Sequence, residues 1–347
     1  MRPIDPASAR ISELCDALEA VVGAGFVLRE PEELRAFECD ALTAYRGLPM
    51  IVVLPYTEQQ IVDIVKICSQ FAVPIVPRGA GTGLSGGAIP TEGSVVLSTS
   101  RMNQVLDIDP LQRVGVVQPG VRNLVVSQAA SVYGLFYAPD PSSQLACTVG
   151  GNVAENSGGV HCLKYGLTLQ NLLRVRGVLS SGEIVEIGSH SADSGGLDLL
   201  ALITGSEGMM LVVTEVSLRL LPRPETARVI LASFDSNEAA ANAVAHIIAS
   251  GVIPAGLEMM DRATTHAVEA FVHAGYDLEA EAVLLCESDG TQIEVEAEID
   301  RLQQLLTEAG ARRVAVSGSE EERQKFWSGR KNAFPAAGRL APDYYCI

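Results

Sequence analysis

The sequence predicts an α+β fold of two domains, and three observations lead to this prediction. Its 347 residues, 48% of them hydrophobic, are enough to fill two cores. Strand and helix patterns mix with glycine-rich loops up to residue 222, and the later pattern has the β-α-β-β-α-β order of a ferredoxin-like fold. Pro222 and Pro224 end the strand that precedes them, so we expect domains at 1–222 and 223–347.

The first domain shows both helical and strand patterns. Thr57 can N-cap a helix that runs to about residue 71, and Glu58 then lies in its positively polarised first turn. We also expect helices over 9–23 and 121–133, strands over 50–54, 113–117 and 211–218, and a hairpin over 172–187 that turns at 180–183.

The second domain alternates between the two periodicities. We expect strands over 229–234, 257–260, 283–286 and near 314, and helices over 237–249 and 293–309.

Composition limits the possible partners and location. The 42 acidic and 25 basic residues give a net charge of −17, which argues against binding to nucleic acid or to an anionic membrane surface. The seven cysteines have no Cys-x-x-Cys spacing, so we expect reduced thiols and no iron–sulfur cluster on this chain. No apolar stretch approaches transmembrane length and no signal-peptide core follows Met1, so we expect a cytoplasmic location.

A glycine-rich loop at 77–87 follows the apolar run at 73–76. Its glycines allow backbone N–H groups to approach a ligand, which is how a chain forms an anion-binding nest. Gly81, Gly83 and Gly86 match the G-x-G-x-x-G pattern of nicotinamide-dinucleotide sites. That pattern requires a following helix, whereas a strand-like run at 95–97 follows here. We therefore expect a pyrophosphate nest between two strands.

Two further glycine-rich stretches bear on the ligand. One covers Pro139–Ser143 and Thr148–Gly159, and the other covers Gly205–Gly208 before a strand. A glycine taken alone is more typical of a tight turn. Two separated nests joined by hydroxyl and amide side chains could instead hold a large dinucleotide.

Together with 256–261 and 327–335, these segments resemble the vanillyl-alcohol-oxidase superfamily, and more narrowly the glycolate-oxidase branch of the FAD-linked 2-hydroxy-acid dehydrogenases. The resemblance covers nearly the whole chain. It implies a PCMH-type FAD-binding domain of two subdomains, followed by a ferredoxin-like α+β substrate (cap) domain. Some relatives attach FAD to a histidine in the first loop; residues 78–83 contain none, so we expect non-covalent FAD. The FAD-binding residues so implied are Arg78, Gly79, Ala80, Gly81, Thr82, Gly83, Pro139, Asp140, Ser142, Thr148, Gly150, Gly151, Ala154, Asn156, Ser157, Gly159, Glu207, Gly208 and Val213.

The resemblance also implies a reaction, the oxidation of glycolate or D-lactate with hydride transfer to the flavin. Arg330 is the expected cation for the substrate carboxylate, because guanidinium binds carboxylates in a bidentate manner. The alternative for Arg330 is a surface pair with Glu320, Glu321 or Glu322. His161 could accept a proton, although a histidine hydrogen-bonded within its loop is commoner. Cys147 is expected to be a packed thiol.

The chain ends at Ile347, inside the expected substrate domain, so we expect a C-terminal truncation. In relatives the next segment supplies a catalytic base and, in some members, metal ligands. The five histidines present show no ligand spacing, and we expect no metal. The expected partners are a second FAD-binding subunit and an iron–sulfur subunit, which could hold the chain at the inner face of the membrane. Two alternatives remain: an FAD-binding module without a complete catalytic site, and a non-redox FAD enzyme like the alkylglycerone-phosphate synthases.

Overall fold

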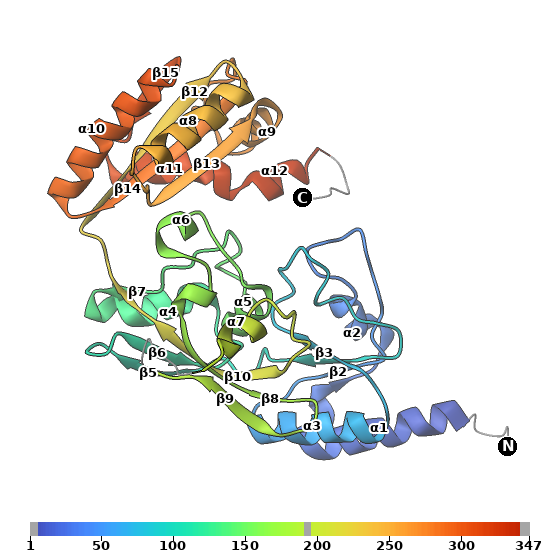
Figure 1. Cartoon of the computed structure of the whole chain (residues 1–347). Coiled ribbons are helices and arrows are strands. Elements are labelled where there is room, and N and C mark those ends of the chain that lie inside the picture. The colour runs from blue at the N-terminus through green and yellow to red at the C-terminus, as the bar shows by residue number, and fades with distance from the viewer. Residues whose placement is uncertain (1–5, 191–195, 341–347) are drawn as a thin grey trace.

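The computed structural model describes residues 6–190 and 196–340. Figure 1 shows an N-terminal region, which ends at β11 (Leu221–Pro222), and a C-terminal region, which begins at β12 (Thr226–Phe234). The first sheet of the N-terminal region has the order β1-β2-β4-β3, in which β2, β4 and β3 are parallel and β1 is antiparallel. Its strands are β1 (Val27–Leu28), β2 (Ile51–Val53), β3 (Ile75–Arg78) and β4 (Val95–Ser98).

Helices α1 (Pro6–Val22) and α3 (Glu58–Gln70) pack on this sheet, while α2 (Pro31–Leu34) joins a smaller cluster with Val52 and Val96. Short 3-10 helices, Ala24–Phe26 and Arg35–Phe37, flank β1 and α2. The predicted cap of α3 is confirmed, since Thr57 Oγ1 accepts a hydrogen bond from the backbone N–H of Gln60 at 3.2 Å.

A second, antiparallel sheet has the order β5-β6-β10-β8-β9. Its strands are β5 (Val105–Asp109), β6 (Val114–Val117), β8 (Leu172–Val178), β9 (Ile184–Gly188) and β10 (Val212–Arg219). Glu58, expected only to favour the helix dipole, also receives hydrogen bonds from Arg176 and Thr214 of this sheet at 2.8 and 2.7 Å. These bonds hold the pKa of Glu58 below its ordinary value and tie α3 to the second sheet.

Helices cover the second sheet around a core of aliphatic residues. These helices are α4 (Asn123–Ala130), extended by a 3-10 turn over Ser131–Tyr133, α5 (Val149–Glu155) and α7 (Leu199–Ile203). The helix α5 differs from the expectation, which took the whole stretch after Thr148 as a nest. Two short elements follow α5, namely α6 (Cys162–Tyr165) and a 3-10 turn at Leu169–Asn171. Strand β7 (Leu135–Phe136) pairs with β11 (Leu221–Pro222) just before the C-terminal region begins.

The C-terminal region confirms the predicted ferredoxin-like order. Its antiparallel sheet runs β13-β14-β12-β15, formed by β12 (Thr226–Phe234), β13 (Gly256–Asp261), β14 (Ala282–Gly290) and β15 (Arg313–Val316). Helices α8 (Asn237–Ala249) and α10 (Gln292–Glu308) pack on one face. Not predicted was α9 (Arg262–Val272), which packs on the other face with α11 (Glu320–Lys331) and α12 (Ala333–Ala337).

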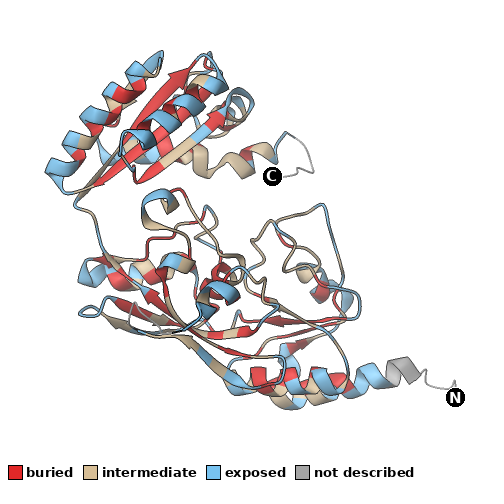
Figure 2. Cartoon of the chain, viewed as in Figure 1, coloured by how far each residue is buried: buried red, intermediate tan, exposed pale blue. Residues whose placement is uncertain are grey.

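Burial follows this architecture. Figure 2 shows the buried residues concentrated in the strands and on the inner faces of the helices that cover them. Val160, from the segment that leads into α6, lies in the same apolar cluster as Trp327 of α11. The C-terminal region therefore packs directly on the glycine-rich segments. No helix in 6–190 or 196–340 is both long enough and apolar enough to cross a bilayer.

Candidate functional site

A cavity of about 570 Å³ lies among the glycine-rich segments, α5 and α12. This volume is within the range of roughly 300–1,000 Å³ typical of small-molecule and cofactor sites. Its lining from the N-terminal region is Asp40, Ala41, Pro77, Gly79, Ala80, Gly81, Thr82, Gly83, Leu84, Gly87, Ala88, Pro141, Ser142, Ser143, Cys147, Thr148, Gly151, Asn152, Ala154, Glu155, Ser157, Gly158 and Glu207. Lys331, Phe334 and Pro335 complete the wall from the C-terminal region.

The loop after β3 lines this cavity and contains backbone donors without a partner among the described residues. The N–H groups of Ala80, Gly81 and Thr82 donate no hydrogen bond to any described residue. Arg78 supports the loop from outside the cavity, because its guanidinium donates to the carbonyls of Cys39 and Ala88 at 2.8 and 3.1 Å. Three unpaired N–H groups in one loop provide the donors that a diphosphate requires.

Helix α5 forms the facing wall. Thr148 caps it by accepting from the N–H of Gly151 at 3.3 Å, and a Cβ on Gly79 would lie 2.2 Å from the Thr148 hydroxyl. Gly79 therefore allows the first loop to lie directly against the helix. Asn152 is buried, and its Nδ2 finds no hydrogen-bond acceptor in the described part of the chain beyond the weakly accepting thiol of Cys147 nearby. An unsatisfied amide in the cavity wall fits a ligand that carries oxygen or ring-nitrogen acceptors.

Carboxylates form a third part of the lining. Burial, followed by the negative charge of Glu155, raises the pKa of Glu207 to about 7. Glu155 in turn accepts from the Ser85 hydroxyl at 2.6 Å. A Cβ on Gly87 would lie 2.0 Å from a carboxylate oxygen of Glu207, so a larger residue there would have to displace the Glu207 side chain. This side of the cavity suits neutral hydroxyl groups better than phosphate oxygens.

The predicted FAD-binding residues fall into two groups. Those that line the cavity are Gly79, Ala80, Gly81, Thr82, Gly83, Ser142, Thr148, Gly151, Ala154, Ser157 and Glu207. The predicted residues that do not line it are Arg78, Pro139, Asp140, Gly150, Asn156, Gly159, Gly208 and Val213. The Pro139 carbonyl accepts from Asn123, Gly150 packs on Pro119, Asn156 ends α5 in the left-handed conformation and Val213 packs in the sheet core. Direct contact of this second group with a cofactor stays a prediction.

Some lining residues were not predicted. Some of these lie within the segments that carried the resemblance, and that position was the one signal by which they could have been predicted. They are Gly87, Ser143, Asn152, Glu155, Gly158, Phe334 and Pro335. Asp40 had no such signal, because it reaches the cavity only when the loop before β2 folds back. There its carboxylate accepts from the N–H of Gly86 at 3.1 Å.

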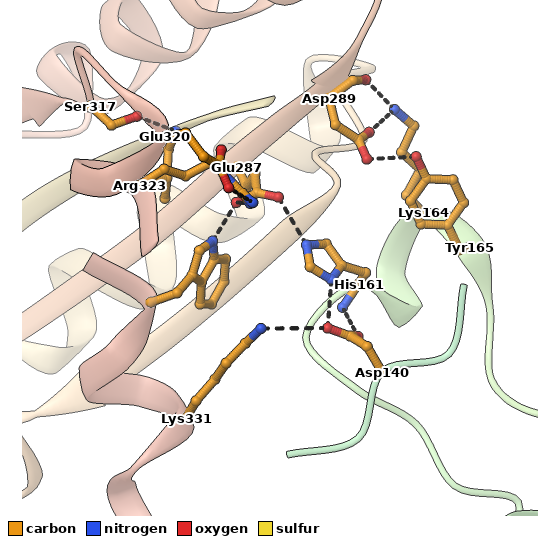
Figure 3. Close-up of polar contacts among 12 residues, drawn as sticks. Asp140, His161, Lys164, Tyr165, Glu287, Asp289, Ser317, Glu320, Arg323 and Lys331 are labelled. Carbon is orange, nitrogen blue, oxygen red and sulfur yellow. Dashed lines mark hydrogen bonds and ion pairs between the residues drawn. The ribbon is translucent and has the colours of Figure 1, made fainter. Parts of the chain in front are cut away.

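His161 joins the two regions (Figure 3). Its Nδ1 lies 2.8 Å from Asp140, and its Nε2 lies 2.9 Å from the buried carboxylate of Glu287 on β14. Burial opposes protonation of His161, but the hydrogen bonds to Asp140 and then Glu287 outweigh it and raise its pKa to about 9. Both ring nitrogens then donate, and His161 is an imidazolium between two carboxylates at neutral pH.

Glu287 is the centre of this arrangement. Besides His161 it accepts from Arg323 at 2.8 Å and from the indole N–H of Trp327. Burial alone would raise the pKa of Glu287, but the donors and positive charges of His161 and Arg323 hold it below the ordinary value. The carboxylate therefore fixes α11 relative to the N-terminal region.

A second set of contacts lies beside the first. Lys164 Nζ donates to the Asp289 carbonyl at 2.6 Å and to its carboxylate, and the Tyr165 hydroxyl donates to the same carboxylate at 2.6 Å. We call these residues together the clasp: Asp140, His161, Lys164, Tyr165, Glu287 and Asp289. Figure 3 shows the clasp bridging α6 and the strands of the C-terminal region.

Arg330 does not line the cavity. Its Nε donates to Glu258 of β13 at 2.9 Å. The alternative predicted a pair of Arg330 with Glu320, Glu321 or Glu322, and it is wrong because the partner of Arg330 is Glu258. Arg323, two turns earlier, pairs with Glu320 instead. A role for Arg330 in binding a substrate carboxylate stays a prediction.

Comparison with known proteins identifies the family. A model described as FAD binding domain matches residues 49–188, and one described as FAD linked oxidases, C-terminal domain, matches residues 223–347. An uncharacterized FAD-linked oxidoreductase of Mycobacterium tuberculosis is 35% identical over 344 residues, which cover 97% of this chain and 73% of that protein. The chain belongs to the FAD-linked oxidoreductases. It therefore contains an FAD-binding domain, as predicted.

Two further relatives carry more specific names. The glycolate oxidase subunit GlcD of Escherichia coli is 56% identical over 321 residues, 92% of this chain and 64% of the relative. A D-lactate dehydrogenase of Anaerostipes hadrus is 33% identical over 303 residues, 85% of this chain and 64% of the relative. The chain thus spans somewhat less than two thirds of the length of these two proteins.

Solved structures support the fold. The structure of p-cresol methylhydroxylase matches this chain with a TM-score of 0.78 at 17% sequence identity, and the match covers 93% of this chain and 69% of that protein's chain. This similarity confirms the predicted PCMH-type fold. An alkyldihydroxyacetonephosphate synthase has a TM-score of 0.78 at 19% identity, covering 98% of this chain and 65% of its own. Because the two names denote different reactions, the shared fold does not identify the reaction.

Within 6–190 and 196–340, no three His, Cys, Asp or Glu side chains are grouped so that they could hold a metal ion. The six cysteines in these ranges are free.

Proposed function

We propose that this chain is the FAD-carrying part of a dehydrogenase that oxidises glycolate or D-lactate to the corresponding 2-oxo acid. The observation that carries the proposal is the 56% identity to the glycolate oxidase subunit over 92% of this chain. The D-lactate dehydrogenase similarity supports the same substrate class. FAD, when bound, supplies the acceptor for the hydride that leaves the substrate Cα.

The described residues fit FAD. The free N–H groups of Ala80, Gly81 and Thr82 would bind the diphosphate oxygens, and Asn152 would donate to a ring or chain acceptor. The facing carboxylates, Glu155 and Glu207, would accept from hydroxyl groups of the ribityl or ribose chain. These contacts divide the cavity into a part for the anionic diphosphate and a part for neutral hydroxyls.

We propose that the FAD is non-covalent. The first glycine loop has no histidine. Cys147 lies in the wall, but burial raises the pKa of its thiol, which disfavours the reactive thiolate. Acid precipitation of the loaded protein should therefore release all of the flavin into the supernatant, whereas flavin retained in the pellet would contradict this proposal.

The clasp would hold the C-terminal region over the cavity and limit access of water. Two predicted catalytic side chains are engaged in this structure: His161 between its carboxylates and Arg330 with Glu258. His161 would have to lose a ring proton and release one carboxylate before it could take the substrate hydroxyl proton. Arg330 would have to exchange Glu258 for the substrate carboxylate.

This engagement favours a second candidate, an FAD-binding module that assembles with partners and turns nothing over by itself. For either candidate we propose that electrons leave through partner subunits, one carrying a second FAD and one an iron–sulfur cluster. The word subunit in the name of the Escherichia coli relative supports an assembly of this kind. We further propose a cytoplasmic location, with these partners holding the chain at the inner face of the membrane.

A dye-reduction assay separates the two candidates. The purified chain is loaded with FAD and given glycolate, D-lactate or L-lactate together with a soluble redox dye. The dehydrogenase predicts dye reduction that requires both FAD and glycolate or D-lactate. Tight FAD binding without dye reduction for any of the three acids would favour the binding module.

A further inference from the structure

The C-terminal region contributes one charged residue to the cavity, Lys331 at the end of α11. Among the described lining residues it is the only lysine or arginine, and the other charged ones are the carboxylates of Asp40, Glu155 and Glu207. An anionic ligand in a cavity of this composition needs a compensating positive charge. Lys331 is placed to supply it.

The ammonium group of Lys331 is not committed to a close partner. Its nearest carboxylate is Asp140, at 4.0 Å, which is the outer limit of an ion pair. The same carboxylate oxygen lies 2.8 Å from His161 Nδ1, and the other oxygen accepts from the His161 backbone N–H at 3.3 Å. Both oxygens of Asp140 therefore already have a hydrogen-bond partner on His161. About a third of the Lys331 side chain is exposed, so it can turn toward a ligand.

The neighbouring Arg330 is in the opposite situation. Its guanidinium lies 2.9 Å from Glu258, both side chains are about a quarter exposed, and it is absent from the cavity wall. A ligand would have to displace Glu258 before it could use Arg330. Lys331 needs no such exchange, because its weak contact with Asp140 is the only ion pair that it makes with a described residue.

The position of Lys331 is fixed by the clasp. Trp327 and Arg323, one and two turns earlier on α11, both donate to Glu287, which is bound to His161 of the N-terminal region. Figure 3 shows Lys331 extending from α11 toward Asp140, next to His161. The lysine is therefore held over the cavity before any ligand binds, which reduces the entropy lost on binding.

We propose that Lys331 is the residue of the C-terminal region that binds an oxyanion in the cavity. That oxyanion is either the carboxylate of the 2-hydroxy acid or the diphosphate of FAD. The inference rests on the proposed function, because it takes both ligands from there. It deepens the proposal by assigning the anion contact to Lys331 rather than Arg330.

The test compares Lys331→Gln and Lys331→Arg with Lys325→Gln as the matched control. Lys325 lies on the same helix, is exposed, and does not line the cavity. The dissociation constant of FAD is measured on the FAD-free protein by fluorescence quenching. The dissociation constant of oxalate, a carboxylate that cannot be oxidised by hydride loss, is measured on the FAD-loaded protein by the change in its flavin spectrum. Circular dichroism checks that each variant is folded.

We expect Lys331→Gln to raise one of the two constants by about tenfold or more, the usual effect of removing a charge-assisted hydrogen bond. A change in the oxalate constant identifies the substrate carboxylate as the ligand, and a change in the FAD constant identifies the diphosphate. Lys331→Arg should stay close to the wild type, and Lys325→Gln should change neither constant.

Both constants within twofold of the wild-type values in folded Lys331→Gln would overturn the inference. An unchanged FAD constant together with no oxalate binding by the wild type would also overturn it. Failure of the proposed function is a separate result: a wild type that binds FAD and oxidises neither acid refutes the dehydrogenase, while the effect of Lys331→Gln on FAD or oxalate binding can still stand.

Discussion

His161→Gln is expected to change how the free energy of unfolding depends on pH. In the folded chain the pKa of His161 is raised to about 9 from an ordinary value of 6.5, because Asp140 and Glu287 accept from its two ring nitrogens. A raised pKa contributes stability that is fully present below about pH 6.5 and is lost as the pH rises through about 9. At 1.36 kcal/mol for each pH unit, the contribution is about 3 kcal/mol.

The assay is urea unfolding of the FAD-free chain at a series of pH values from 6 to 10. Trp327, the only tryptophan of the sequence, donates to Glu287 and so reports on the region around the clasp by its fluorescence. The quantity of interest is the difference in unfolding free energy between wild type and His161→Gln, because the titration of all other groups largely cancels in it.

This difference should shrink by about 3 kcal/mol between pH 6.5 and 9.5. Glu321→Gln is the control, since Glu321 is exposed on α11 and outside the clasp, and its effect should be within about 0.5 kcal/mol at either pH. Parallel curves for wild type and His161→Gln over the whole range would refute the imidazolium between two carboxylates.

Three other substitutions test the fold and the cavity. Thr57→Ala removes the cap of α3 and should lower the free energy of unfolding by about 1 kcal/mol in the same urea assay; no measurable loss would contradict the capping role. Gly79→Ala brings a Cβ to 2.2 Å from the Thr148 hydroxyl and should weaken FAD binding by about tenfold or more, whereas Gly25→Ala, with nothing within 4 Å of the added Cβ, should leave it unchanged. The pKa of Glu207 is raised to about 7, so its carboxyl group loses its proton as the pH rises from 6 to 8. The wild type should therefore bind FAD less tightly over this range, and Glu207→Gln should show a weaker dependence on pH. Identical pH profiles for the two proteins would exclude an effect of Glu207 ionisation on FAD binding.

Local signals in the sequence were sufficient for much of the fold. Thr57 with Gln60 three residues later forms a capping box, and α3 begins where that pattern predicts. The helix over Asn237–Ala249 and the sequence positions of the strands in the C-terminal region follow from regular periodicity and short connections. These features depend on residues close together in the chain.

Features that depend on distant contacts were missed. The helix α5 forms in a glycine-rich stretch because Thr148 caps it and Gly150 packs on Pro119, a contact that single-sequence patterns do not reveal. Side-chain partners were missed for the same reason. Arg330 was expected at the substrate carboxylate from its residue type and from the resemblance, but Glu258, which pairs with it in this structure, is 72 positions earlier in the chain. Glu287 follows a predicted strand without any signal of its own, and its importance comes from partners on α6 and α11.

The most direct test of the account is an ultraviolet–visible spectrum of the FAD-loaded chain before and after anaerobic addition of glycolate or D-lactate. The account predicts flavin absorption bands that bleach after the addition, because the cavity holds FAD and the chain delivers the 2-hydroxy acid to it. Flavin bands that persist with both acids would contradict the dehydrogenase, and a colourless protein that FAD cannot reconstitute would contradict the cofactor site itself.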